Sequence, residues 1–141
     1  MAQEPESFIL LAEDNRADVY LVRKSFEEHG IVQDLRVVND GEEAIRFLAG
    51  LGSENSCPRL VVLDLNLPKI TGHEILERLR AHPNCGGIPV IVMTSSDSPV
   101  DKSEIARLGA TAYFRKPTRL DEFMQLGALV KRVLEQSRLG R

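Results

Sequence analysis

Charged and polar side chains follow four aliphatic runs of this chain, at the point where each run ends. They are Glu13 and Asp14, Asp64, Thr94, and Lys116. Three acids that share one crevice repel each other, and burying unpaired charge costs several kcal/mol, so such a crevice requires a cation. All candidate ligands are oxygens. That favours Mg²⁺, or Mn²⁺ in its place, over zinc, which prefers Cys and His.

The same residues suit chemistry on phosphate. Lys116 can counter the charge of a phosphoryl group, and the Thr94 hydroxyl can donate a hydrogen bond to one of its oxygens. Asp64 is the best candidate nucleophile, because a carboxylate can form an acyl phosphate while a metal neutralises charge. Asn66 cannot act as the general acid that a phosphatase of this kind uses on its leaving group. The site is therefore predicted to hold phosphate rather than turn over substrates.

The elements that position these residues alternate along the chain. Apolar runs predict five strands, over 8–12, 35–38, 60–63, 88–93 and 111–114. Amphipathic segments between and after them predict five helices, the last starting after Thr118 and running almost to Arg141. Continuous apolar strands joined by helices are typical of a parallel sheet covered on both faces. Carboxyl ends of such strands border the crevice where ligands bind, so we expect the five side chains to converge.

Composition narrows the class of protein. The chain has 141 residues, 43% hydrophobic and 28% charged, which predicts one domain over 1–141, with a core over about 7–135 and no output domain. No apolar run approaches the roughly 20 residues that span a bilayer, and no leader is visible, so we expect a cytoplasmic protein without membrane contact. Residues 107–141 hold eight Lys or Arg against three Asp or Glu. Their helical spacing indicates a solvated face, so nucleic-acid binding is not expected.

The two cysteines lie far apart in the sequence. Cys57 and Cys85 are 28 residues apart, in stretches rich in Pro, Gly, Asn and Ser, with no CxxC pair. We interpret them as free thiols in loops.

Together these motifs resemble the signature of receiver domains of two-component response regulators. The match comprises Glu13-Asp14, Asp64 within Leu63-Asp64-Leu65-Asn66-Leu67-Pro68, Thr94, and Lys116-Pro117. The resemblance implies a flavodoxin-like (βα)5 fold, a three-layer α/β sandwich with strand order 2-1-3-4-5. It also implies a signalling module rather than an enzyme.

The resemblance assigns a role to each matching position. Asp64 would accept phosphate from a histidine kinase or phosphotransfer protein. Glu13, Asp14 and Asp64 would hold Mg²⁺ together with the backbone carbonyl of Asn66. Thr94 and Tyr113 would form the conformational switch, relayed through the loop 95–99, and Lys116 and Pro117 would be joined by a cis peptide.

Partners follow from the same resemblance. Segments such as Ala17-Asp18-Val19 and Asn39–Ala44 resemble stand-alone regulators paired with bacterial and cyanobacterial phytochrome kinases, so a phytochrome-type sensor kinase is the expected donor. Output would be a protein contact, a homodimer or onward phosphorelay. The surface made by the fourth helix, fifth strand and last helix is the expected interface.

Three other functions compete as explanations of the same residues. A flavin-binding electron carrier would need a Ser/Thr/Gly-rich phosphate loop after the first strand, where this chain has Glu13-Asp14-Asn15. An aspartate-nucleophile phosphohydrolase is disfavoured by Asn66. An interaction module of the same fold that never accepts phosphate is the third, and the sequence leaves it open.

Overall fold

Five parallel strands form one sheet at the centre of the molecule. The computed structural model describes residues 8–51, 56–96 and 98–139. The strands are β1 (Phe8–Ala12), β2 (Asp34–Val38), β3 (Leu60–Asp64), β4 (Val90–Thr94) and β5 (Ala112–Arg115). Their order is β2-β1-β3-β4-β5, and every neighbouring pair is parallel. The predicted flavodoxin-like fold and strand order are confirmed.

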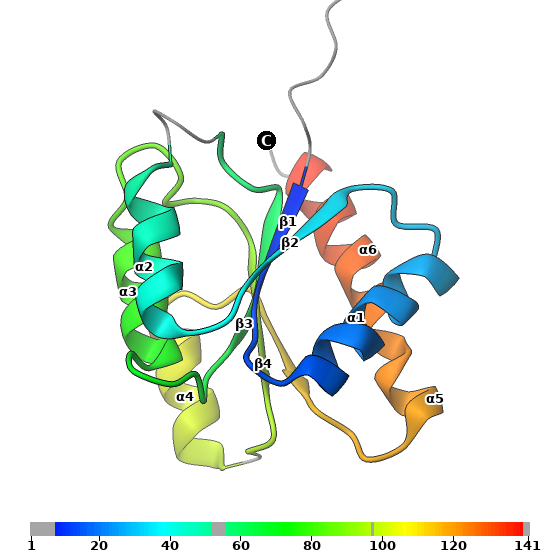
Figure 1. The fold of residues 1–141 in the computed structure, drawn as a ribbon. Coiled ribbons are helices and arrows are strands. Elements are labelled where there is room, and N and C mark those ends of the chain that lie inside the picture. The colour runs from blue at the N-terminus through cyan, green and yellow to red at the C-terminus, as the bar shows by residue number, and fades with distance from the viewer. Residues whose placement is uncertain (1–7, 52–55, 97, 140–141) are drawn as a thin grey trace, which may run out of the picture.

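Helices cover both faces of the sheet (Figure 1). They are α1 (Arg16–Glu28), α2 (Gly41–Ala49), α3 (Gly72–Arg80), α4 (Pro99–Arg107), α5 (Leu120–Phe123) and α6 (Gln125–Leu139). One layer contains α2, α3 and α4, and the other contains α1, α5 and α6. Across the described residues, no helix combines the length and apolarity needed to cross a membrane.

Side-chain alternation along the strands divides the core in two. In β1, Phe8, Leu10 and Ala12 pack towards α2 and α3. Ile9 and Leu11 pack on the opposite face, towards α1 and α6. Successive residues of a strand point to opposite faces, so a strand buried on both faces needs apolar residues throughout. This explains the continuous apolar runs in the sequence.

The helices α2 and α4 begin at the capping residues that the sequence indicates. The Asp40 carboxylate accepts a hydrogen bond from the backbone N–H of Glu43 at 2.8 Å, and Glu43 accepts one from the N–H of Asn39 at 2.6 Å. This reciprocal arrangement satisfies N–H groups that a helix start leaves unpaired. Ser98 caps α4 in the same way, with Pro99 at its first position.

The end of the chain departs from the expected single helix. The structure has a short α5, whose N-cap is Arg119 without a side-chain hydrogen bond, followed by a separate α6. The Met124 carbonyl between them accepts hydrogen bonds from the Ser25 hydroxyl at 2.7 Å and from the His29 ring at 2.9 Å. Side chains of α1 therefore bond to the backbone where the two helices meet. That contact is tertiary, and local periodicity does not reveal it.

The interpretation of the cysteines as free thiols was wrong. Cys57 and Cys85 form a disulfide, with Cα atoms 5.6 Å apart. Cys57 precedes β3 and Cys85 precedes β4, and these two strands are hydrogen-bonded neighbours. Parallel neighbours bring the segments that precede them to the same edge of the sheet. Separation in the sequence therefore gave no indication of proximity in space.

Candidate functional site

The predicted site residues gather at the carboxyl edge of the sheet. Asp64 and Thr94 are the last residues of β3 and β4, Glu13 follows β1, and Lys116 follows β5. Register brings the first two close, because Asp64 pairs with Met93, the residue before Thr94. Glu13 is held by its backbone N–H, which donates to the Val38 carbonyl of β2 at 3.0 Å.

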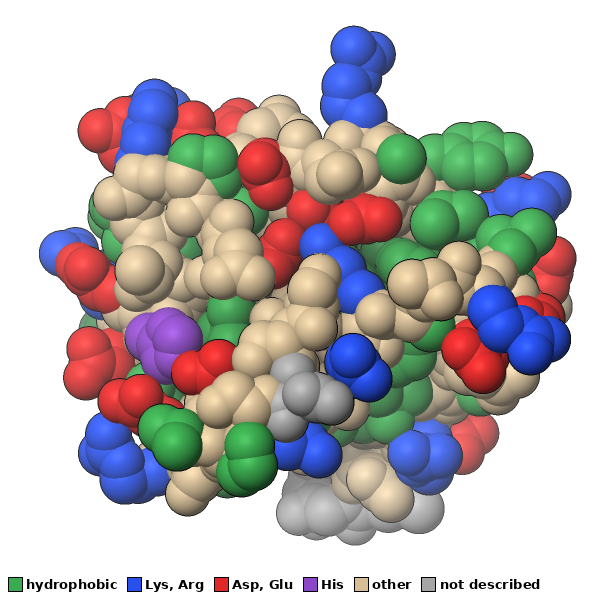
Figure 2. Space-filling model, turned by 90° about the horizontal axis from the view of Figure 1, so that it is seen from below, with side chains coloured by type: hydrophobic (Ala, Val, Ile, Leu, Met, Phe, Trp, Pro, Cys, Tyr) green, Lys and Arg blue, Asp and Glu red, His purple; other side chains and the backbone are tan. Residues whose placement is uncertain are grey.

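Three carboxylates meet at this edge. One oxygen each of Glu13, Asp14 and Asp64 lies within 4.8 Å of the others. Glu13 and Asp64 are buried, at 0% and 3% exposure, whereas Asp14 is exposed. Figure 2 looks onto this edge, where acidic side chains gather around a basic one near the middle of the face. The arrangement concentrates negative charge in a place open to solvent on one side.

Lys116 partly balances that charge. Its Nζ lies 3.0 Å from Glu13 Oε1, 3.1 Å from Asp64 Oδ2 and 2.7 Å from Asp18 Oδ2. Burial lowers the pKa of the Lys116 ammonium, but the neighbouring carboxylates of Asp18, Glu13 and Asp64 outweigh it and raise the pKa above its usual range. Lys116 therefore stays charged at any ordinary pH.

Asp18 is a member of the cluster to which sequence reasoning gave no role. It lies in the first turn of α1, and its carboxylate makes the shortest contact of Lys116. Residues 18 and 116 are 98 positions apart, so no local pattern links them. The signal for Asp18 in the sequence was its position shortly after the first strand. An acid one turn into the helix that follows β1 lies close to the end of that strand.

Glu13 carries an unsatisfied oxygen. Its Oε2 accepts a hydrogen bond from the N–H of Asn15 at 3.0 Å, but its buried Oε1 has no hydrogen-bond partner among the described residues. Lys116 Nζ approaches Oε1 as an ion pair without the alignment of a hydrogen bond. Burial is the main cause that raises the pKa of Glu13, to about 7, and the charge of Asp64 adds to it. A buried oxygen without a hydrogen-bond donor, beside two further carboxylates, fits a hard divalent cation.

The two oxygens of Asp64 have different partners. Oδ1 accepts a hydrogen bond from the backbone N–H of Asn66 at 3.0 Å, and Oδ2 faces Lys116. The loop that follows is packed tightly on α3, because a Cβ at Gly72 would lie 2.7 Å from Leu65 Cα and 2.9 Å from the Asp64 carbonyl oxygen. Only glycine fits there without moving the backbone beside Asp64.

Thr94 and Tyr113 are connected through the backbone of Ser96. The buried Thr94 hydroxyl accepts a hydrogen bond from the Ser96 N–H at 3.1 Å. The Tyr113 hydroxyl donates to the Ser96 carbonyl, and Lys102 Nζ lies 5.2 Å from the centre of its ring. Of the loop 95–99, residue 97 lies outside the described residues. Both expected switch side chains are therefore hydrogen-bonded to the backbone of the same residue, Ser96.

The expectation of a cis peptide before Pro117 was wrong. The bond between Lys116 and Pro117 is trans. The trans isomer is favoured by about 0.5–1 kcal/mol before proline, so a cis bond needs support from its surroundings. In this structure Lys116 reaches the acid cluster with a trans bond.

With this geometry in place, comparison with known proteins identifies the family. Residues 9–127 match the family model of the response regulator receiver domain. The chain belongs to the response regulator receiver family. Receiver domains act as signalling modules that are phosphorylated by histidine kinases and bind Mg²⁺.

Curated relatives of this receiver span most of its length. Response regulator Rcp1 of Synechocystis is 35% identical over 124 residues, covering 86% of this chain and 84% of the relative. The probable methanogenesis regulatory protein FilR2 of Methanothrix harundinacea is 35% identical over 122 residues, with 86% and 78% covered.

Solved structures of similar receivers have the same fold. The phosphorylated cyanobacterial phytochrome response regulator RcpA superposes with a TM-score of 0.83 at 30% identity, covering 94% of this chain and 96% of that one. The Mn²⁺-bound form of Rcp1 superposes with a TM-score of 0.79 at 32% identity, with 89% and 91% covered.

Proposed function

We propose that this receiver accepts a phosphoryl group on Asp64 from a sensor histidine kinase of the phytochrome type. The observation that carries the proposal is the meeting of three carboxylates with the ammonium of Lys116 at the carboxyl edge of the sheet. Relatives described as phytochrome response regulators support the class of donor.

The chemistry assigned to Asp64 is transfer of a phosphoryl group between two nucleophiles. One carboxylate oxygen attacks phosphorus, the bond from phosphorus to the donor imidazole nitrogen breaks, and the imidazole leaves as a neutral ring after taking a proton. Lys116, 3.1 Å from Asp64 Oδ2, neutralises part of the charge of the incoming phosphoryl oxygens. Such transfer depends mainly on positioning and electrostatics.

A divalent cation fits the same cluster. Glu13, Asp14 and Asp64 would hold Mg²⁺ or Mn²⁺, and the backbone carbonyl of Asn66 would add a further oxygen. The buried Oε1 of Glu13, which has no hydrogen-bond donor among the described residues, supports this assignment. When bound, the cation neutralises charge that develops on the phosphoryl oxygens.

Output is assigned to the segment that joins Thr94 and Tyr113. A phosphoryl group on Asp64 offers new acceptors to the Thr94 hydroxyl, which in this structure is an acceptor for the Ser96 N–H. A shift of Thr94 would disturb Ser96, and with it the bond from the Tyr113 hydroxyl. The affected surface is α4, β5 and α6, where we expect a protein partner or a second copy of the chain.

Labelling with a small phosphodonor tests the assignment of Asp64. Acetyl phosphate with Mg²⁺ should add one phosphoryl group, which mass spectrometry should locate on Asp64, and Asp64→Asn should abolish it. Asp34→Asn makes the same chemical change at an exposed position at the amino end of β2 and should leave labelling intact. Labelling elsewhere, or none, would refute the proposal and favour a constitutive interaction module.

Two further measurements refine the proposal. Phosphotransfer profiling against histidine kinases should show fastest transfer from a phytochrome-type kinase, and a faster donor of another class would correct that part alone.

Turnover of a simple aryl phosphate should be absent, because Asn66 offers no proton to a leaving group.

A further inference from the structure

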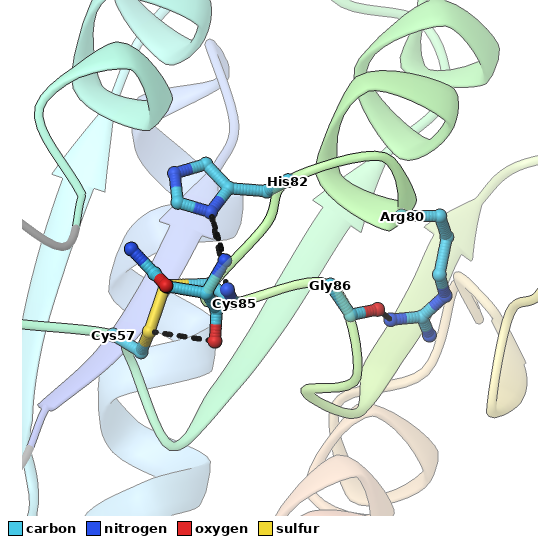
Figure 3. Close-up of a disulfide and its surroundings, with 6 residues drawn as sticks. Cys57, Arg80, His82, Cys85 and Gly86 are labelled. Carbon is cyan, nitrogen blue, oxygen red and sulfur yellow. Dashed lines mark hydrogen bonds between the residues drawn. A yellow bond between two sulfur atoms is a disulfide. The ribbon is translucent and has the colours of Figure 1, made fainter.

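A second pair of reactive side chains lies at the opposite edge of the sheet from the acids. Cys57 and Cys85 join the segments that lead into β3 and β4 (Figure 3). We propose that this pair is a reversible thiol–disulfide site, reduced by a dithiol reductant that attacks the sulfur of Cys57. The argument rests on the unequal exposure of the two cysteine residues and on hydrogen bonds that hold the loop of Cys85 independently of the disulfide.

The two cysteines differ in access. Cys85 is buried, at 1% exposure, and belongs to the core cluster under α2 and α3. Cys57 is partly exposed and lines a groove of about 510 Å³ with Pro58, Asn84 and Ser137 among its other lining residues. Attack on a disulfide requires access to the sulfur attacked. A reductant can therefore approach Cys57, and Cys85 is the sulfur that leaves.

The exchange balances in two steps. A thiolate of the reductant attacks Sγ of Cys57, a mixed disulfide forms, and Cys85 leaves as a thiolate that takes a proton. The second thiol of the reductant then attacks the other sulfur of the reductant, which is bonded to Cys57 in the mixed disulfide. Cys57 is released as a thiolate and is protonated in turn. Two electrons and two protons pass from the dithiol to the protein, and the reductant ends as a disulfide.

The loop that carries Cys85 does not depend on the disulfide for its position. The guanidinium of Arg80 donates to the carbonyls of Gly86, Ile88 and Gly109 at 2.6–3.0 Å. His82 Nδ1 accepts hydrogen bonds from the N–H groups of Asn84 and Cys85, both at 3.1 Å (Figure 3). Reduction should therefore leave the loop in place, with both thiols close enough to reoxidise.

In the reduced form, a hydrogen-bond acceptor lies close to the thiol of Cys57. Its Sγ lies 3.7 Å from the carbonyl oxygen of Asn84, a distance at which a thiol can donate a weak hydrogen bond. A disulfide sulfur has no hydrogen to donate. On reduction the two sulfurs must separate, which rotation of the Cys57 side chain can achieve, and the Asn84 carbonyl then offers the thiol an acceptor.

The closed ring of chain gives the site a consequence for the rest of the molecule. It runs from Cys57 to Cys85 and contains β3 with Asp64, the loop with Asn66, and α3. A cross-link over a ring of this length restricts the unfolded chain and local opening of the ring. We expect the reduced protein to stay folded and to unfold at a temperature lower by about 10 °C.

The first test follows the redox state of the native protein. Incubation in dithiothreitol buffers of graded ratio, followed by alkylation and mass spectrometry, should show a reversible two-electron transition without urea, with a matching drop in Tm. Asp34→Asn, at an exposed position at the amino end of β2, keeps both cysteines and should behave alike. Reduction that occurs only after unfolding, or thiols that do not reoxidise, would overturn the proposal.

The second test asks which sulfur is attacked. With oxidised glutathione, Cys85→Ser should form a mixed disulfide at Cys57, whereas Cys57→Ser should leave the buried Cys85 unmodified. Cys85→Ala repeats the first arm without placing a hydroxyl in the core, and circular dichroism checks that each variant is folded. A mixed disulfide at Cys85 in preference to Cys57 would contradict the mechanism.

Discussion

The carboxyl edge and the amino edge of the sheet differ in what stabilises them. At the carboxyl edge, buried Glu13 and Asp64 repel each other and Lys116 holds them together. At the amino edge, a disulfide joins two segments, and the guanidinium of Arg80 binds carbonyl oxygens of the loop. Burying like charges costs stability, whereas a cross-link adds to it. The comparison teaches that the buried acids lower stability at one end of these strands, whereas the cross-link raises it at the other.

The largest expected effect comes from removing the positive charge of Lys116 at the carboxyl edge. Lys116→Met leaves the carboxylates of Glu13 and Asp64 buried without their partner, so the free energy of unfolding should fall by about 3 kcal/mol without metal. Labelling of Asp64 by acetyl phosphate should slow by about 100-fold, since the positive charge that neutralises the incoming phosphoryl group is lost.

Urea denaturation and initial labelling rates measure these two effects. Lys131→Met removes an exposed lysine of α6, near the amino edge, and should change the unfolding free energy by less than about 0.5 kcal/mol. Equal losses in the two variants would remove the distinction between the edges.

A matched pair of glycines tests how tightly the backbone beside Asp64 is packed. In Gly72→Ala the new Cβ meets the backbone of Asp64 and Leu65, so we expect a loss of about 2 kcal/mol together with weaker Mg²⁺ binding. A Cβ at Gly87, in the loop near the disulfide, meets nothing within 4 Å. Gly87→Ala should therefore stay within about 0.5 kcal/mol of the parent. Thermal unfolding with and without Mg²⁺ compares them, and a larger loss at Gly87 would reverse the comparison.

Glu13→Gln should separate stability from function at the carboxyl edge. The pKa of Glu13 is raised to about 7, so between pH 4.5 and 7 the folded state binds more protons than the unfolded state. The metal-free parent should therefore lose stability as pH rises through this window, and the variant should not. At pH 8 the variant should be more stable by about 1 kcal/mol, because a buried charge is gone.

Metal binding should change in the opposite direction. Mg²⁺ affinity of Glu13→Gln, measured by titration calorimetry, should fall by about tenfold or more as a charged ligand becomes neutral. Glu28→Gln, on the exposed side of α1, is the matched control and should change neither quantity. A variant that is less stable and binds Mg²⁺ unchanged would refute the role given to Glu13.

The smallest expected effect concerns the link between Thr94 and Tyr113. Tyr113→Phe removes only the hydroxyl that donates to Ser96, and should cost about 1 kcal/mol or less. Labelling of Asp64 should be unchanged, because the hydrogen bond that is lost is to the Ser96 carbonyl and not to the acids. Partner binding or dimerisation should become less dependent on phosphorylation, as chromatography with light scattering can show. Tyr20→Phe, on an exposed tyrosine of α1, should change none of these.

Much of the fold was predictable because its signals are local. The apolar runs that become β1 and β3, the capping residues Asp40 and Ser98, and the acids that follow the strands can all be recognised within a few residues of sequence. Parallel strands share one carboxyl edge, so the meeting of Glu13, Asp14 and Asp64 followed from topology.

What the sequence by itself determined is therefore which segments become strands and helices, and which side chains end at the same edge. Tertiary structure alone decided that Asp18 contacts Lys116, that Ser25 and His29 bond to the backbone between α5 and α6, and that Cys57 meets Cys85. The physical reason is the separation along the chain between the residues that interact. Periodicity and capping depend on neighbours a few residues away, whereas these contacts join segments 28 to 99 residues apart, which only the packed chain brings together.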